Sequence, residues 1–331
     1  MLAGIRMRIG IGVGLRIAIG AAWIAGAGAA CAADDAAREP DGQGAPGAAD
    51  AGAAEHDVEV SGGSAAPTAP DGDADAGPAG ASRAGSAGRP LHILQMNLCN
   101  SGQNPGCFSG GQSVAEAYQI TMRVQADVVT LNEICEDDVA TELFGELREA
   151  WAADWTYWVF APAKSRRTGG PLPCNDGQRY GVGIIGHVPA AAWSGFEFDG
   201  DRYAHQDLTD NEMRAWACAS LGGVEACTTH LQSRHGDVAL LQCQELMDPV
   251  LPQFRAGHGD GSRPSIVSGD LNLAFGGDPD VQSCLPPGWF RKGDTQVQHV
   301  MATDDFTYES TELIPMERSD HDALLVRLIA P

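Results

Sequence analysis

The segment SIVSGDLNLAF, residues 265–275, contains two polar residues that could do chemistry. Asp270 and Asn272 follow a short apolar run two positions apart, and because side chains alternate along a strand, both would leave the same face. A carboxylate beside an amide can orient a water molecule and hold an anionic oxygen. Taken alone, the two residues could equally cap a turn toward the GGDPD sequence that follows.

Polar residues also close or precede other apolar segments along the chain: Asn97, Glu133, His230, Asp320 and His321. Hard divalent cations prefer oxygen ligands, and Mg²⁺ binds one or two carboxylates while it keeps several waters. Histidine can take up or release a proton near neutral pH. Each residue has a structural alternative when considered singly, such as a surface acid, a turn amide or a buried histidine. Their joint occurrence at strand ends indicates one metal-assisted site.

The elements that must position these residues are mostly strands. Hydrophobic patterns predict strands at 91–98, 127–134, 155–161, 180–188, 213–221, 224–231, 264–273, 296–303 and 323–329. They predict helices at 114–125, 137–152 and 237–251. This mixture favours packed sheets with helices outside them.

Three regions of the 331-residue chain differ in composition. Residues 1–33 have the layout of a signal peptide, in which Cys31 is a candidate site of lipid attachment and simple cleavage is the alternative. Residues 34–90 are mostly Ala, Gly, Asp, Pro and Ser, which predicts a disordered linker. Residues 91–331 suffice for one catalytic-size domain with its own core. We therefore expect a secreted protein, with anchoring to the bacterial cell surface only through such a lipid.

The cysteine count also predicts an exported protein. Nine cysteines, one of them in the predicted leader, leave an even eight, as is typical of oxidised extracellular domains. A two-residue turn at Gly222-Gly223 would pair Cys218 with Cys227 on a non-hydrogen-bonded rung, where a disulfide can form. The neighbours Cys99 and Cys107 suggest a second bridge. Three pairings remain open for the four other cysteines: Cys135, Cys174, Cys243 and Cys284.

The charge of the predicted domain limits its partners. From residue 91 onward there are 33 Asp and Glu against 15 Lys and Arg, a net charge of about −18. So acidic a body does not attract nucleic acid by its overall charge. A phosphate ester would therefore need a local positive group or a bound cation.

Five short motifs stand in order along residues 91–331: QMNL, VVTLNE, CTTHL, SGDLN and SDH. The ordered set resembles the endonuclease/exonuclease/phosphatase superfamily, the fold of DNase I, AP endonucleases, bacterial sphingomyelinases and the cytolethal distending toxin nuclease subunit. The resemblance implies an α+β fold, a four-layer α/β/β/α sandwich of two packed mixed sheets with outer helices. It also implies metal-dependent hydrolysis of phosphoesters at one end of the sandwich.

The resemblance assigns metal binding to three of these residues. Glu133 corresponds to the principal ligand, and Asn97 and Asp320 would support it directly or through water. The implied ion is Mg²⁺, with Mn²⁺ or Ca²⁺ as alternatives.

The resemblance assigns catalytic roles to four more. Asp270 would orient the attacking water, and Asn272 would hold the phosphate and that water. His230 and His321 would contact phosphate oxygens, with His321 acting in proton transfer. A cation and imidazolium donors would stabilise the negative charge that builds on those oxygens.

Arg214 stands where several family members carry a phosphate-facing arginine. Its guanidinium suits a phosphate. However, the simple hairpin register pairs Arg214 with Leu231, on the opposite face from His230, so a bulge would have to bring it to the site. The alternative is a surface arginine at the edge of the hairpin.

Gln298 departs from the family pattern. The strand before the last motif usually carries an Asp that orients the catalytic histidine, and Gln can accept a hydrogen bond there but offers no charge. Either the enzyme is slower, or Asp304 or Asp305 substitutes from the following loop.

The sequence leaves several substrates open. Nucleic acid is the first choice, with KSRRTGG (164–170) as the best basic cluster or an ordinary solvated loop. A lipid headgroup is the sphingomyelinase-like alternative, in which CLPPGWF (284–290) would meet a membrane or else tuck into the core. A small-molecule phosphoester is a third substrate class. A hypothesis of another class is a catalytically weakened surface-binding domain. We expect a monomer.

From the sequence alone, Gln298→Asp is predicted to leave phosphoesterase activity unchanged or to raise it, because it restores the usual carboxylate. The turnover rate of the purified variant checks this, and a large loss would contradict the alignment of this strand.

Overall fold

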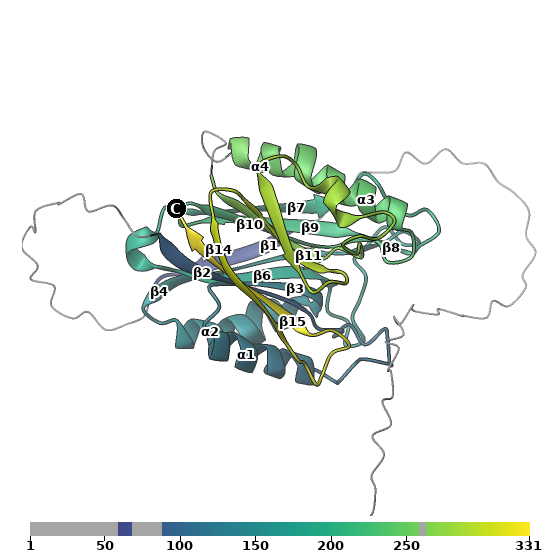
Figure 1. The fold of residues 1–331 in the computed structure, drawn as a ribbon. Helices are drawn as coiled ribbons and strands as arrows, with labels where there is room; N and C mark the ends of the chain where they lie inside the picture. Colours follow the sequence, from purple (N-terminus) through teal and green to yellow (C-terminus); the bar gives the residue numbers. More distant parts are fainter. Residues whose placement is uncertain (1–58, 68–87, 258–262) are drawn as a thin grey trace, which may run out of the picture. The chain divides into compact units, whose positions relative to one another are not determined.

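The computed structural model describes residues 59–67, 88–257 and 263–331 (Figure 1). The predicted leader, Cys31 and most of the predicted linker lie outside these residues. Within the described part of the chain, two large sheets contain all strands but two, and these two, β5 (Lys164–Ser165) and β8 (Glu212–Met213), pair with each other.

The first sheet has seven strands in the order β1-β4-β6-β3-β2-β15-β14. Its strands are β1 (Ser61–Ala65), β2 (Arg89–Asn97), β3 (Val128–Cys135), β4 (Asp154–Pro162), β6 (Tyr180–Pro189), β14 (Thr307–Ile314) and β15 (Ala323–Ala330). β2 and β3 run parallel, and their neighbours run antiparallel to them, so the sheet is mixed.

The second sheet has six strands in the order β12-β13-β11-β10-β9-β7. Its strands are β7 (Phe196–Arg202), β9 (Ala215–Leu221), β10 (Val224–His230), β11 (Ser265–Asp270), β12 (Trp289–Gly293) and β13 (Gln298–Thr303). β10 and β11 are its parallel pair. Each sheet therefore has one parallel pair, whose two carboxyl ends lie at the same edge.

Helices cover the outer face of each sheet. α1 (Gln112–Val124) and α2 (Phe144–Ala150), which follows a wider helical segment at Asp138–Leu143, pack on the first sheet through one apolar cluster. α3 (Gly236–Glu245) and α4 (Leu251–Gly257), joined through Leu246–Val250, pack on the second. Figure 1 shows these helices on the outer sides of the two sheets. A third apolar cluster lies between the sheets. The predicted four-layer α/β/β/α sandwich is confirmed.

The space between the sheets is apolar along most of its length and polar at one end. On β2, Leu91 and Ile93 point into the apolar cluster, and the next residues on that face are Gln95 and Asn97, all of them buried. The same change occurs along β11, where Ile266 is followed on its inner face by Ser268 and Asp270. The strand ends therefore build a polar wall inside the sandwich.

One segment of the predicted disordered linker is a strand. Residues 61–65 form β1, which pairs antiparallel with β4, and Val60 packs against the core between the sheets. Arg179 fixes it further by donating to the carbonyl of Glu59 at 2.9 Å. The prediction of disorder is wrong for this stretch because its order comes from an available sheet edge, which composition does not reveal.

Four disulfides link the eight cysteines outside the predicted leader. Cys218–Cys227 forms in the predicted register, with the Cα atoms 4.0 Å apart, and Cys99–Cys107 is also present. The open pairing resolves to Cys135–Cys174 and Cys243–Cys284. Such a set is typical of oxidising extracellular compartments. None of the helices in the described residues is long and apolar enough to cross a membrane.

Gly269 lets β10 and β11 approach beside the polar wall. A Cβ at this position would lie 2.0 Å from the backbone oxygen of Thr229. We therefore predict that Gly269→Ala lowers the free energy of unfolding by about 1–3 kcal/mol, because neither strand can move without disturbing the sheet.

The matched control is Gly145→Ala in α2, where a Cβ would meet nothing within 4 Å. It should stabilise the protein by about 0.5–1 kcal/mol, since alanine favours helix. Urea unfolding followed by circular dichroism measures both variants, and equal effects would contradict this account of Gly269.

Candidate active site

The site forms where both parallel strand pairs end. Asn97 and Asn132 are register partners on β2 and β3, and His230 and Asp270 are partners on β10 and β11. The packing of the two sheets brings these ends together. All seven residues given metal or catalytic roles by the ordered motifs lie here, at strand ends or in the loops that follow or precede them: Asn97, Glu133, His230, Asp270, Asn272, Asp320 and His321.

Asn97 joins carboxylates from the two sheets. Its side-chain nitrogen donates to Glu133 Oε1 at 2.9 Å and to Asp270 Oδ2 at 3.2 Å. Its oxygen accepts from the backbone N–H of Cys99 at 3.1 Å. In this structure Asn97 therefore supports the carboxylates as a donor.

Two histidines face the same oxygen of Asp270. His321 Nε2 lies 3.7 Å from Asp270 Oδ2 and 3.9 Å from Asp320 Oδ1, and His230 Nε2 lies 4.0 Å from Asp270 Oδ2. Asp270 is 2% exposed, whereas Asp320 is exposed. The arrangement places one acid oxygen within 4.0 Å of two imidazole nitrogens.

Backbone conformation aims two of the polar side chains. Glu133 has φ of 52° at an irregularity where β3 has one more residue than β6, and Asn272 has φ of 48°. The left-handed region is costly for a residue other than glycine or asparagine, and a bulge redirects the side chain. Asn272 also donates its backbone N–H to Asp270 Oδ1 at 3.1 Å and its side-chain nitrogen to the Leu231 carbonyl at 2.9 Å.

The carboxylates repel one another in a partly buried setting. Burial raises the pKa of Glu133 to about 7, the hydrogen bond from Asn97 opposes this, and the charges of Glu212, Asp270 and Asp320 raise it further. A cation placed here would relieve that repulsion, and oxygen donors suit a hard one. The donor set therefore fits the implied divalent ion, with Glu133 and Asp320 as holders.

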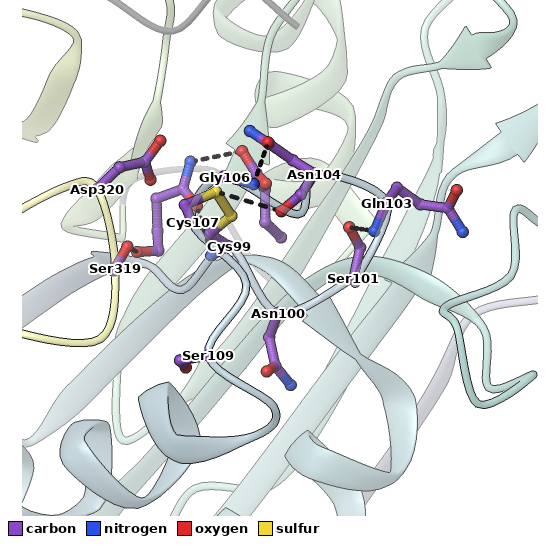
Figure 2. The surroundings of a disulfide bond; sticks show 12 residues. Cys99, Asn100, Ser101, Gln103, Asn104, Gly106, Cys107, Ser109, Ser319 and Asp320 are labelled. Carbon is purple, nitrogen blue, oxygen red and sulfur yellow. Dashed lines mark hydrogen bonds between the residues drawn. A yellow bond between two sulfur atoms is a disulfide. The ribbon is translucent and has the colours of Figure 1, made fainter. Parts of the chain in front are cut away.

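The groups of three potential ligand atoms that lie within 4.8 Å of one another among the described residues are Cys99, Cys107 and Asp320, and Cys135, Cys174 and Asp176. Each contains both sulfurs of a disulfide, so neither offers the thiolates that a soft metal prefers. Figure 2 shows the first group. The Cys99–Cys107 disulfide, in the loop after Asn97, lies beside Ser319 and Asp320. Ser319 donates to the Asn97 carbonyl at 2.6 Å, which ties the two loops together.

Burial disfavours the charged form of His230. It lowers the pKa of His230 well below the ordinary value, and the charges of Arg214 and His321 lower it further. The Nδ1 of His230 has no hydrogen-bond partner among the described residues. The buried positive charge beside His230 is that of Arg214.

Arg214 reaches the site, and the surface alternative is wrong. It is 4% exposed and lies between β8 and β9, because the ladder of β9 with β10 ends at Trp216 and Thr229. The pairing with Leu231 therefore does not form, and the break between strands does what the expected bulge would have done. Arg214 Nη1 lies 3.2 Å from Glu212 Oε1.

Gln298 does not contact His321 as an orienting group. Its side-chain nitrogen donates to the Asp322 carbonyl at 2.6 Å, and its oxygen lies 3.5 Å from Gln95 Nε2. Asp304 and Asp305 do not substitute for it, because they are exposed beyond the far end of the six-residue strand β13.

Three residues near the site were missed by sequence reasoning: Tyr180, Glu212 and Asp294. Tyr180 and Glu212 line a small pocket with His230. Burial raises the pKa of Asp294, the backbone hydrogen bonds from Gln296 and Gln298 lower it, and the charges of Asp270 and His321 act on it in opposite directions, so Asp294 lies near both. The polar GDT turn before the QVQHVMAT strand was the available signal for Asp294.

Comparisons with known proteins show the same fold. No protein-family model and no curated sequence matches the chain. Among solved structures, it is similar to an endonuclease/exonuclease/phosphatase from Beutenbergia cavernae DSM 12333, with 18% identity over 73% of this chain and 72% of that chain and a TM-score of 0.52. It is also similar to ANGEL2, a 2′,3′-cyclic phosphatase, with 13% identity, coverage of 73% and 96%, and a TM-score of 0.52.

A further similar structure is an endonuclease/exonuclease/phosphatase family protein from Bacteroides thetaiotaomicron, with 13% identity, coverage of 74% and 99%, and a TM-score of 0.50. The chain thus has the endonuclease/exonuclease/phosphatase fold, also called the DNase I-like fold. The predicted resemblance is confirmed at this level.

The raised pKa of Glu133 predicts how stability without metal depends on pH. Between about pH 4.5 and 7 the folded chain keeps a proton that the unfolded chain, with the ordinary value of 4.5, has released. The free energy of unfolding should therefore fall as pH rises through this window. Glu133→Gln should remove this part of the decline, so that the metal-free variant melts above the wild type at pH 8.

Thermal melts at several pH values with a chelator check this, with the exposed Asp305→Asn as control. Added Mg²⁺ should raise the melting temperature of the wild type and of the control but not of Glu133→Gln. An equal response of all three would contradict metal binding at Glu133.

The hydrogen bonds of the Gln298 side chain reverse the prediction, made from the sequence, that Gln298→Asp leaves activity unchanged or raises it. A carboxylate cannot donate to the Asp322 carbonyl, and it would lie buried. We now predict a loss of about 1–3 kcal/mol in the free energy of unfolding, together with lower activity as the loop of His321 loosens. Denaturant unfolding and turnover of the same sample measure both effects, and unchanged stability would contradict this reading.

Proposed function

We propose that this protein is a secreted, divalent-metal-dependent phosphodiesterase, with nucleic acid as the first substrate choice. The observation that carries the proposal is the bridge of Asn97 between Glu133 of one sheet and Asp270 of the other, with both histidines within 4.0 Å of Asp270. Phosphoester hydrolysis needs such a set of oxygen ligands, a water-orienting acid and imidazoles in one place.

The residues divide the work as follows. Glu133 and Asp320 would hold Mg²⁺ or a similar ion, which when bound supplies positive charge for the phosphate oxygens. Asp270 orients the attacking water, with Oδ1 fixed by the backbone of Asn272 and Oδ2 by Asn97. His321, which is more exposed than His230, moves the proton. Arg214 adds a fixed positive charge.

Asn272 and His230 complete the set. Asn272 supports the phosphate and the water, and neutral His230 donates one hydrogen bond to a phosphate oxygen. Gln298 acts only indirectly, through the Asp322 carbonyl next to His321.

A small phosphodiester is the second candidate substrate. The basic cluster at 164–170 offers little open charge, because Lys164 is 5% exposed and Arg166 donates to the carbonyls of Asp207 and Asp210. The segment 284–290 does not favour a lipid surface, since Trp289 and Phe290 are partly buried against the core. A compact substrate requires neither surface.

The decisive experiment incubates the full chain with plasmid DNA, RNA, sphingomyelin and bis(p-nitrophenyl) phosphate, with Mg²⁺ or Mn²⁺ and with a chelator. We expect metal-dependent cleavage that Glu133→Ala lowers at least 100-fold, because the principal ligand is lost. The exposed Asp305→Asn variant should retain full activity.

The outcome sorts the alternatives. Nicking of plasmid supports the nuclease, cleavage of the model diester alone supports a small-molecule enzyme, and hydrolysis of sphingomyelin without nicking supports the lipid reading. If no substrate is cleaved under any condition, the enzyme hypothesis fails in favour of a catalytically weakened binding domain.

A further inference from the structure

Arg214 carries a buried positive charge whose hydrogen-bonding capacity is not used up. Nη2 lies 3.4 Å from the Ser233 hydroxyl, and neither Nε nor Nη1 makes a hydrogen bond within the described part of the chain. The contact of Nη1 with Glu212 is an ion pair at 3.2 Å. Buried donors of this kind usually have a partner, and phosphate oxygens suit a guanidinium.

Glu212 forms an ion pair with Arg214 beside the site. It belongs to β8, which pairs with β5 through Ser165, and its side chain is 21% exposed. It lines the small pocket together with Tyr180 and His230, and its charge acts on Glu133 as well. A phosphate that binds Arg214 is therefore also close to the Glu212 carboxylate.

The fixed charges at this end of the sandwich are mostly negative. Glu133, Asp270, Asp320 and Glu212 stand against Arg214, and when all four acids are ionised a divalent cation would still leave an excess of negative charge. A phosphate monoester carries about −1.5 to −2 at neutral pH, by analogy with a phosphorylated side chain. A diester carries a single charge, so the like-charge repulsion in this low-dielectric setting is smaller for the diester.

We propose that Glu212 is a specificity-determining residue, whose charge disfavours phosphomonoesters and so makes the site selective for phosphodiesters. This rests on the proposed function, since it concerns the same site. Glu212 takes no part in the chemical step. It acts by repelling the second charge of a monoester and by competing with the phosphate for Arg214.

The test measures kcat/KM of the full chain with Mg²⁺ for bis(p-nitrophenyl) phosphate, a diester, and p-nitrophenyl phosphate, a monoester. The wild type should prefer the diester, and Glu212→Gln should lower the diester-to-monoester ratio at least 10-fold. Glu212→Asp keeps the charge and should keep the preference. Glu309→Gln, an exposed acid on β14, is the control and should leave the ratio unchanged.

A folded Glu212→Gln variant with the wild-type ratio would overturn the inference, as would a wild type that hydrolyses both esters equally well. Neither result affects the proposed function, which fails only if the wild type cleaves no phosphodiester. A second measurement does not depend on the folding of any variant. Inhibition of the wild type by dimethyl phosphate should be tighter than by methyl phosphate, and the reverse order would overturn the inference.

Discussion

The site depends on buried hydrogen bonds that join polar groups of one sheet to those of the other. Asn132, which is fully buried, makes such bonds at the crossing point. Its side-chain oxygen accepts from Gln95 of the first sheet and from the backbone N–H of Asp270 of the second, each at 2.7 Å, and its nitrogen donates to the Thr229 carbonyl at 3.0 Å. Because the side-chain amide of Asn132 bonds to both sheets, it fixes their relative position at this end. The positions of the Glu133 and Asp270 carboxylates depend on that arrangement.

The hydrogen bonds of Asn132 hold together a site whose backbone conformation and charges are unfavourable. Glu133 adopts a left-handed backbone conformation, and several acids share one small region. Such strain persists only where the surroundings over-determine it. Here both oxygens of Asp270 are held by hydrogen bonds, from Asn97 and from the Asn272 backbone. Under the proposed function, Asp270 would need little rearrangement when a substrate arrives, and such preorganisation is the main source of electrostatic catalysis.

Sequence patterns predicted what local alternation determines and missed what depends on distant partners. The core strands and the Cys218–Cys227 register follow from period-two patterns and one Gly-Gly turn, whereas the division into two sheets was implied by the family resemblance. The other disulfide pairing stayed open because connectivity is a tertiary property. Glu212 was missed because a two-residue strand leaves no periodic signal. Gln298 was assigned a role by position alone, and only its bond to the Asp322 carbonyl showed a different one.

β1 has a consequence outside the active site. An open sheet edge presents unpaired N–H and C=O groups to any extended chain, and this is a common start of aggregation. Here the edge of β4 is covered by Ser61–Ala65, a segment of the same molecule made only of serine, glycine and alanine. β1 pairs with β4 and becomes the outermost strand of the sheet, so the edge that stays open carries no large apolar side chain. A stretch with almost no core-forming residues thus protects the edge of the sheet. Its loss would lower the solubility of the protein before it affected the activity of the site.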